Sequence, residues 1–382
     1  MAVVAISLPA PYEASDGRIE GRAPAATTDV GVFVSGGGRY RLVTMRHVAH
    51  GGRFAIGATG LPAGDRSLRI VAYANGKVLG SKVIRPVSGL PRLAFRTRPA
   101  RVTDASVQRR LKGISGPGVR AVWMRGVTSG DAASYNAGAR FTAASTLKLG
   151  ILMASLAHNR QNPVGGSVWS FYKRMILDSD NVASNNVEIQ MGGSTSGGSA
   201  MVNAFCRQLG CRDTDMYGGY IPNTSRPTPV LARLVDTPGT APAVVARAAA
   251  TVPPVRTERS PSIPTYGKHT TAHDLGVLAS TLVEAGGGRG KARRQGISRH
   301  EARVAIYLLI HARYRGVVRP NVKNVVGHKS GWLSGVEHDA ALVFTPEGTV
   351  VTVVMSQGGG VGLSASGRYA RRVLKLALAR LR

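Results

Sequence analysis

The stretch that decides the fold is Phe141-Thr-Ala-Ala-Ser145-Thr-Leu-Lys148-Leu-Gly-Ile-Leu-Met153. It predicts a long apolar helix from 145 to about 157. Positions 145 and 148 are one helical turn apart, so the serine hydroxyl and the lysine amine lie on the same face. Because the helix is apolar all round, Lys148 is expected to be buried, where an amine needs partners. The alternative is a lysine that snorkels out of a core helix.

This pairing predicts nucleophilic chemistry. A serine hydroxyl is a poor nucleophile without an adjacent base, and a lysine can be that base when desolvation or nearby positive charge lowers its pKa. At the start of a helix, the Ser145 N–H can also stabilise an oxyanion. We expect the second oxyanion donor to be the Trp332 N–H, on a strand that follows a second lysine motif.

A second motif is Ser179-Asp-Asn181. Its serine hydroxyl can relay a proton to a leaving nitrogen, and the Asn181 amide can hold both Lys148 and a substrate amide. Taken alone, Ser, Asp and Asn in a row would be read as a helix cap.

The third motif is Lys329-Ser330-Gly331. Lys329 offers positive charge to a substrate carboxylate, and the Ser330 hydroxyl offers a hydrogen bond. Taken alone, Lys329 would be read as a solvated charge at a strand end. Another S-x-x-K, Ser170-Phe-Tyr-Lys173, has no matching motifs around it.

The three motifs occur in the order S-x-x-K, S-D-N, K-S-G, and the ordered set with K-T-G is a signature of class A β-lactamases and penicillin-binding proteins. From about residue 103 to 382 the chain resembles the class A branch of these penicillin-recognising serine hydrolases. The likeness extends to Thr270-Thr-Ala-His-Asp-Leu and Glu337-His-Asp-Ala-Ala-Leu-Val. It implies an acyl-enzyme on Ser145, with β-lactams or D-alanyl-D-alanine peptides as substrates.

The chain departs from the class A pattern in two places, and both bear on hydrolysis of the acyl-enzyme. Only 34 residues separate Ser145 from Ser179, which predicts a shortened helical block, and the stretch before Thr270 carries an insertion. Class A enzymes hydrolyse the acyl-enzyme with a glutamate in a loop ahead of the T-T-x-x-D helix. Glu258 resembles that base, although Ser262 stands where an asparagine is expected; the alternative is an exposed loop carboxylate.

The first part of the chain, residues 1–97, reads as β. Short runs such as Ser67-Leu-Arg-Ile-Val-Ala-Tyr alternate with turns, and Asn75-Gly76 is a strong hairpin signal. We expect a small β-sandwich that resembles bacterial immunoglobulin-like modules, and a proline-containing linker over 86–102.

The second domain is expected over 103–382. Helices, strands, a helical block, more strands and a final helix follow one another. This order predicts an α+β domain, in which an antiparallel sheet is flanked by helices and an all-α part is inserted between its strands.

The 382 residues include 50 Lys and Arg against 20 Asp and Glu, a formal net charge of +30. Such a surface attracts polyanions, for example an anionic cell-wall polymer; the alternative is a background bias toward arginine. The basic residues form no nucleic-acid-binding motif, so we expect no nucleic-acid partner.

The two cysteines, Cys206 and Cys211, could close a disulfide loop in an exported protein or be two buried thiols, and they are too few for a metal cluster. We expect no metal and no cofactor. No stretch approaches the length of a transmembrane helix. The first residues read as a strand, so we expect an exported protein whose signal is removed or lies upstream.

Three functions remain open at this point. The first is a β-lactamase-like hydrolase, the second is a cell-wall D,D-peptidase that β-lactams acylate, and the third is a catalytically idle wall-binding protein. The complete set of Ser145, Lys148, Ser179, Asn181 and Lys329 argues against the third.

Overall fold

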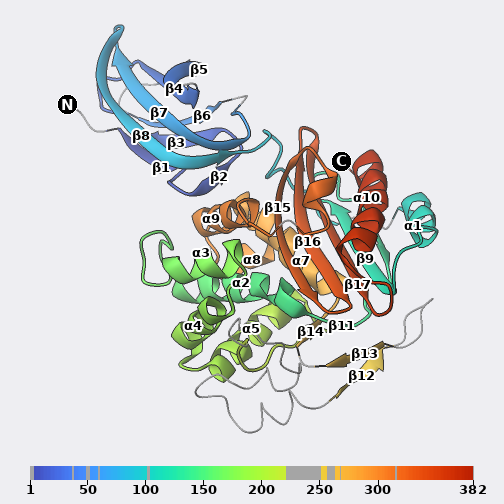
Figure 1. Cartoon of the computed structure of the whole chain (residues 1–382). Coiled ribbons are helices and arrows are strands. Elements are labelled where there is room, and N and C mark those ends of the chain that lie inside the picture. The colour runs from blue at the N-terminus through green and yellow to red at the C-terminus, as the bar shows by residue number, and fades with distance from the viewer. Residues whose placement is uncertain are drawn as a thin grey trace.

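The computed structural model describes residues 4–36, 38–48, 52–58, 61–100, 104–220, 251–255, 263–266, 268–314 and 316–381. Two sheets form an N-terminal β-sandwich (Figure 1). One has the order β1-β3-β6, with strands Ala5–Leu8, Arg18–Arg22 and Arg53–Gly57. The other has the order β2-β8-β7-β4-β5, with strands Glu13–Ser15, Lys77–Gly89, Gly64–Ala74, Asp29–Gly36 and Arg39–His47.

Alternation along the strands builds this sandwich. In β4, Val30, Val32 and Val34 point into the core, as the period of two requires. The β7–β8 hairpin turns at Asn75 and Gly76, whose φ angles of 46° and 78° fit the type I′ turn that matches the twist of two strands. Both the sandwich and its hairpin agree with the sequence prediction.

The larger domain is built on an antiparallel sheet of order β10-β9-β17-β16-β15. Its strands are Ala132–Tyr135, Val119–Gly126, Gly348–Gln357, Val336–Thr345 and Val325–Leu333. Helices α1 (Ala105–Lys112) and α10 (Leu363–Arg380) cover one face, and α7 (Ala272–Gly286) and α9 (Arg299–Ile310) cover the other (Figure 1). Asp104 and Thr271 cap these helices, because their side chains accept from backbone N–H groups at the starts of α1 and α7.

An all-α block is inserted between the sheet's strands, as predicted. It contains α2 (Lys148–Asn159), α3 (Trp169–Leu177), α4 (Asn181–Gly192) and α5 (Thr195–Leu209). The short strands β11 (Phe141–Thr142) and β14 (His269–Thr270) pair at its base. The remaining elements are β12 (Thr251–Val255), β13 (Ile263–Tyr266), α8 (Gly290–Arg294) and the 3₁₀ turns η1 (Ala144–Leu147) and η3 (Arg319–Asn321).

Three expectations differ from the structure in detail. Ser145 lies in the 3₁₀ turn η1 rather than in the α-helix, which starts at Lys148. Pro86 belongs to strand β8, not to the linker. The sequence also predicts a helix over 301–315, whereas helix α9 ends at Ile310. The sequence also predicts a short helix over 241–250, and this range lies outside the described residues.

Cys206 and Cys211 are buried free thiols rather than a disulfide. The Cys211 Sγ lies 3.5 Å from the Asp274 carbonyl oxygen at the start of α7. Among the described helices, none is long and apolar enough to cross a membrane.

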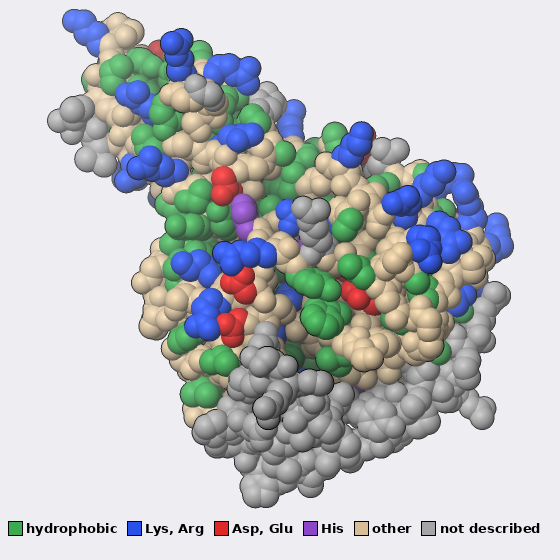
Figure 2. Space-filling model, in the orientation of Figure 1, with side chains coloured by type: hydrophobic (Ala, Val, Ile, Leu, Met, Phe, Trp, Pro, Cys, Tyr) green, Lys and Arg blue, Asp and Glu red, His purple; other side chains and the backbone are tan. Residues whose placement is uncertain are grey.

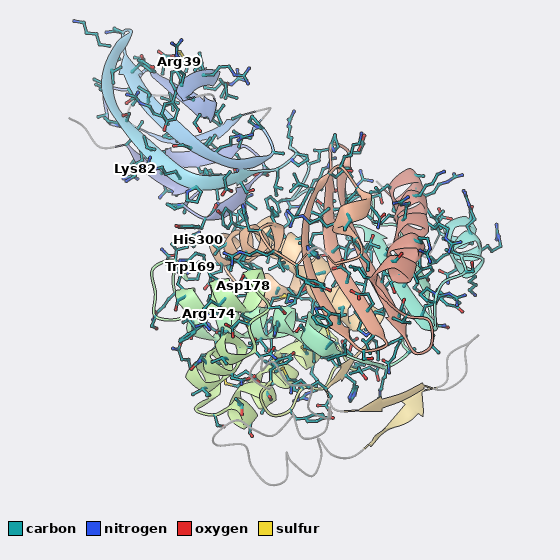
Figure 3. All side chains as sticks on the ribbon, in the orientation of Figure 1. Arg39, Lys82, Trp169, Arg174, Asp178 and His300 are labelled. Carbon is teal, nitrogen blue, oxygen red and sulfur yellow. The ribbon has the colours of Figure 1, made fainter. Side chains whose placement is uncertain are left out.

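The sandwich is fixed to the larger domain through helix α9. Arg299 forms a two-pronged ion pair with Glu20, and His300 hydrogen-bonds Glu13, which is fully buried. Figure 3 shows Trp169 and His300 at this junction; the Trp169 ring packs edge-on against Tyr12 at 5.3 Å. Acidic groups of the sandwich therefore meet basic groups of α9.

Arg303 is the buried centre of this junction, with an exposure of 2%. Its guanidinium donates to Asp16 at 3.1 Å and to the Gly286 carbonyl at 2.9 Å, and lies 4.2 Å from the centre of the Phe95 ring. Phe95 belongs to the predicted linker, so this segment is packed rather than loose.

Replacing Arg303 with alanine is expected to lower the free energy of unfolding by about 3–5 kcal/mol, because it leaves Asp16 unpaired and a cavity behind. The measurement is urea unfolding of the full chain. Arg299→Ala, at a half-buried ion pair, should cost about 1 kcal/mol or less. Equal losses for the two variants would contradict the assignment of Arg303 as the buried centre.

Candidate active site

Ser145 sits in a turn that the central sheet holds in place. The preceding Ala144 has a φ of 47°, a left-handed conformation that is strained for a non-glycine residue. The buried His338 of β16 donates through Nε2 to the Thr142 carbonyl at 3.0 Å and accepts at Nδ1 from the Ser356 N–H at 3.2 Å. Burial lowers the pKa of His338 to about 4, so the ring stays neutral and serves as a brace.

Lys148 is completely buried and has the polar partners that burial demands. Its Nζ donates to Asn181 Oδ1 at 2.6 Å and to the Ser179 carbonyl, and lies 3.3 Å from Ser179 Oγ. The snorkelling alternative is therefore wrong, and the first two sequence motifs meet at one amine.

The pKa of Lys148 is well below its ordinary value, first because of burial and then because of the Lys329 and Lys268 ammonium groups. Asp180 and Glu188 act in the opposite direction. A lowered pKa is what a lysine needs in order to accept a proton near neutral pH.

Ser179 joins Lys148 to the third motif. Its backbone is left-handed, with a φ of 56°, and its Oγ accepts from Lys329 Nζ at 3.0 Å. The helix cap at this point is Asp180, which accepts from the Ala183 N–H and pairs with Arg174. The Ser179 hydroxyl is thus left free of capping and lies between two amines.

Lys329 is buried, with an exposure of 2%, and is not the solvated strand-end charge that the alternative proposed. Burial lowers its pKa to about 8, and Asp339 opposes this shift. Ser330, whose carbonyl accepts from Lys329 Nζ at 2.9 Å, is also buried.

Gly331 brings strand β15 into contact with the nucleophile turn. A methyl group at its Cα would lie 2.8 Å from the backbone nitrogens of Ser145 and Thr146. Only glycine allows this approach, which places the Ser145 N–H beside the backbone that leads to Trp332. The Trp332 side chain is exposed and stacks on Tyr314 at 5.9 Å.

Sequence reasoning missed Tyr220, which forms the wall beside Lys148. The Tyr220 hydroxyl donates to the Ala144 carbonyl at 3.1 Å, and the ammonium groups of Lys148 and Lys268 lie 4.7 and 4.8 Å from its ring centre. Asn185 holds its backbone through two hydrogen bonds of 2.6 Å. Asn185 ends the segment Ser179-Asp-Asn-Val-Ala-Ser-Asn, which was the available signal for this contact.

Lys268 and Glu188 are both buried near Tyr220 and act on each other electrostatically. Lys268 donates to the Gly219 carbonyl at 2.7 Å, and Glu188 accepts from the Ser199 hydroxyl at 2.8 Å. Burial lowers the pKa of Lys268 to about 8 and raises that of Glu188 to about 8, and each charge partly offsets the effect on the other. No short motif marks either residue in the sequence.

The predicted hydrolytic base, Glu258, lies outside the described residues, as does Ser262. Ser145, Lys148, Ser179, Asn181, Lys329, Ser330, Gly331 and Trp332 are all brought together at the junction of η1, α4 and β15. No group of three or more His, Cys, Asp or Glu side chains suited to a metal ion occurs among the residues that the structure describes.

Solved structures with the same fold include PBP-A, at a TM-score of 0.51 and 16% identity, with 74% of this chain and 98% of that chain covered. A mutant of PBP-A in its acyl-enzyme complex with penicillin G gives the same values. The class A β-lactamase of the last common ancestor of Gram-negative bacteria has a TM-score of 0.50 and 18% identity, with 73% and 100% covered. At sequence identities this low, the likeness shows a shared fold and nothing about function.

A comparison with curated protein sequences found no significant match. The sequence model described as the beta-lactamase enzyme family, in contrast, matches residues 158–374, which is more than half of the chain. Because this match covers more than half of the chain, and the larger domain has the fold of these solved structures, the chain belongs to the beta-lactamase enzyme family.

Proposed function

We propose that this protein forms an acyl-enzyme on Ser145 with β-lactams and with peptides that end in D-alanyl-D-alanine. One observation carries the proposal: a single buried hydrogen-bond network joins Lys148, Ser179, Asn181 and Lys329 beside the Ser145 turn. In the solved PBP-A mutant, a protein of the same fold holds penicillin G as an acyl-enzyme.

In the first step, neutral Lys148 takes the proton of the Ser145 hydroxyl while Oγ attacks the amide carbonyl. The lowered pKa of Lys148 makes its neutral form accessible. The Ser145 N–H and the Trp332 N–H stabilise the oxyanion that develops. Ser179 Oγ, between Lys148 and Lys329, then passes a proton to the nitrogen that leaves.

The substrate is held by its carboxylate and its amide. Lys329 and the Ser330 hydroxyl bind the carboxylate next to the leaving nitrogen, and the Asn181 amide binds the acyl-side amide. Because Lys329 is buried, its charge acts in a medium of low dielectric constant and is strong at short range.

Hydrolysis of the acyl-enzyme decides between a β-lactamase and a D,D-peptidase. The two acidic groups that act on Lys148 are committed elsewhere, since Asp180 caps α4 and Glu188 is buried against Ser199. The residue beside Lys148 is Tyr220, whose side chain has no carboxylate that could activate water. This arrangement favours slow release, and with it the peptidase, unless Glu258 supplies the base.

A fluorescent penicillin tests both the formation of the acyl-enzyme and its hydrolysis. Labelling that disappears in Ser145→Ala supports the acyl-enzyme, and no labelling of the wild type contradicts it. Release within seconds would favour the β-lactamase, and release over many minutes the peptidase. Glu258→Gln should slow release without stopping labelling if Glu258 positions the water; an unchanged release rate removes it from the mechanism.

Replacing Lys268 with methionine is expected to slow acylation at pH 7 by about tenfold, because the nearby positive charge that lowers the pKa of Lys148 is lost. The pKa of Lys148 then rises, and the pH–rate profile moves toward alkaline pH. Lys268→Arg keeps the charge and should keep the profile. An unchanged profile in Lys268→Met would show that Lys268 is purely structural.

We further propose that the protein is exported and that its basic surface binds anionic cell-wall polymer. Figure 2 shows lysine and arginine side chains spread over the sandwich and the larger domain. Four of the five acidic residues of positions 1–97 lie at the junction with α9, which leaves the outer surface of the sandwich cationic. Binding to a wall preparation should be released by salt; retention at 1 M salt contradicts an electrostatic origin.

A further inference from the structure

The five-stranded sheet of the sandwich carries exposed apolar side chains on its outer face. In β4, Val30, Val32 and Val34 point into the core, so the residues between them face outward. Of the eight large hydrophobic side chains that are exposed among the described residues, five lie on this outer sheet face. These five are Tyr40, Leu42, Met45, Val78 and Val83, with exposures from 39% to 57%. Single exposed apolar residues are ordinary, but a group of them on one face marks a binding surface.

The register of the strands makes this surface continuous. Residues directly opposite on neighbouring strands share a face, and one such row crosses β5, β4, β7 and β8. It consists of Leu42, Phe33, Arg69 and Val83. A methyl group added to Gly31, in the next row, would lie 3.0 Å from the Phe33 ring and 3.2 Å from the Tyr73 ring. It would also lie 3.5 Å from the terminal methyl group of Met45, so these side chains converge over the glycine and form one patch.

Exposed basic side chains lie on the same strands as this patch. They are Arg39, Arg41, Arg46, Arg69, Lys77, Lys82 and Arg85. The acidic residues of β4, β5, β7 and β8 are Asp29 and Asp65. Asp65 is held by Tyr307 and His311 of the larger domain, and Asp29 lies 3.5 Å from His47. Figure 2 shows hydrophobic side chains among basic ones on the sandwich.

The junction with the larger domain leaves the outer sheet face accessible. The strand order is β2-β8-β7-β4-β5, and β2, at one edge, packs against α9. Strand β5, which carries three of the five exposed apolar residues, is at the opposite edge. Figure 3 shows Arg39, the first residue of β5, at the end of the sandwich away from the larger domain. A partner can therefore approach this face without contact with the Ser145 turn.

The partner must match both the apolar and the cationic side chains. An anionic polymer satisfies the cations but gains nothing from Leu42 or Met45. A second copy of this chain would bring the arginines of two β5 strands together, and like charges repel. A bilayer that contains anionic phospholipids offers negative phosphates at its surface and an apolar medium below them, so it matches both kinds of side chain.

We propose that the outer sheet face binds the surface of an anionic lipid bilayer. Leu42, Met45 and Val83 enter the boundary between headgroups and acyl chains, where apolar side chains leave water. The Tyr40 ring has an apolar body and a polar end, which suits it to the same boundary. The arginine and lysine stems lie along the apolar side chains while their charged ends reach the phosphates. This proposal does not depend on the acyl-enzyme.

The test is sedimentation of the full chain with lipid vesicles at low salt. The vesicles contain phosphatidylcholine and phosphatidylglycerol in a ratio of about three to one, or phosphatidylcholine alone. The wild type is expected to bind the mixed vesicles at least about tenfold more strongly than the neutral ones. Leu42→Ser/Met45→Ser keeps the net charge and should weaken binding to the mixed vesicles by about tenfold or more, because two apolar side chains are lost from the contact.

Val182→Ser/Leu363→Ser is the matched control for this variant. It replaces two apolar side chains of similar exposure, 40% and 53%, on the larger domain, and vesicle binding should be unchanged. Arg39→Gln/Arg41→Gln removes two cations from the edge strand and should weaken binding to the mixed vesicles by about tenfold or more. All four altered side chains of the sandwich are exposed, so both sandwich variants are expected to fold, and thermal unfolding checks this.

Three results would overturn the bilayer as partner. The first is a wild-type protein that does not bind the mixed vesicles. The second is a Leu42→Ser/Met45→Ser protein that binds them as the wild type does, since charge alone would then explain the binding. The third is a dimer of the wild type that is lost in this variant while vesicle binding is unchanged, which would assign the face to a second copy. None of these results bears on labelling of Ser145 by penicillin.

Discussion

Replacing Lys148 with methionine is expected to slow acylation of Ser145 by about 100- to 10,000-fold, the contribution of a positioned general base. Methionine has a similar length and suits a buried position, so the apolar packing of α2 is kept while the base is lost. Asn181 Oδ1 then loses its 2.6 Å hydrogen bond, which should lower stability by about 1–3 kcal/mol. The measurement is the rate of labelling by fluorescent penicillin.

The chain supplies its own control for this variant. Lys173 belongs to the other S-x-x-K, is partly buried on α3 and has its Nζ 5.5 Å from the Trp169 ring centre. Lys173→Met should label at the wild-type rate. If Lys148→Met labels within threefold of the wild type while remaining folded, Lys148 is not the base.

Replacing Gly331 with alanine is expected to reduce the acylation rate by about 100- to 1,000-fold, the value of one oxyanion donor. The new methyl group would lie 2.8 Å from the backbone nitrogens of Ser145 and Thr146, and it meets backbone, which cannot rotate away as a side chain could. The Ser145 N–H must therefore move from its position beside β15.

Gly367 offers the comparison for this substitution. It lies in α10, and a methyl group added there meets nothing within 4 Å. Gly367→Ala should keep full activity and gain up to about 1 kcal/mol of stability, because alanine favours a helix more than glycine does. Stopped-flow acylation and thermal unfolding of both variants separate a local steric effect from a general one. A Gly331→Ala protein that acylates at the wild-type rate would exclude the proposed oxyanion site.

Much of the fold could be predicted because local patterns and tertiary structure agree. Alternating residues in the sandwich strands and the Asn75-Gly76 turn act over a few residues, and the structure keeps them. The differences arise where packing overrides local preference. Pro86 was assigned to a linker, yet it lies in strand β8, which continues to Gly89.

The residues that would hydrolyse the acyl-enzyme, and those that surround Lys148, could be predicted much less well. Glu258 was chosen by its spacing from Thr270, in a region where the insertion removes any fixed relation between sequence distance and position in space. Tyr220 and Lys268 carry no motif, because their role comes from the side chains that surround them rather than from their neighbours in sequence.

The sequence by itself determined the spacing of Ser145 and Lys148, the order of the three motifs and the domain class, since each follows from residue type and short spacing. Only the tertiary structure decided the electrostatics. Lys148, Lys268 and Lys329 come from α2, from the segment before β14 and from β15, and they converge in a region of low dielectric constant. Like charges brought together out of water lower one another's pKa values, and no one-dimensional pattern records that distance.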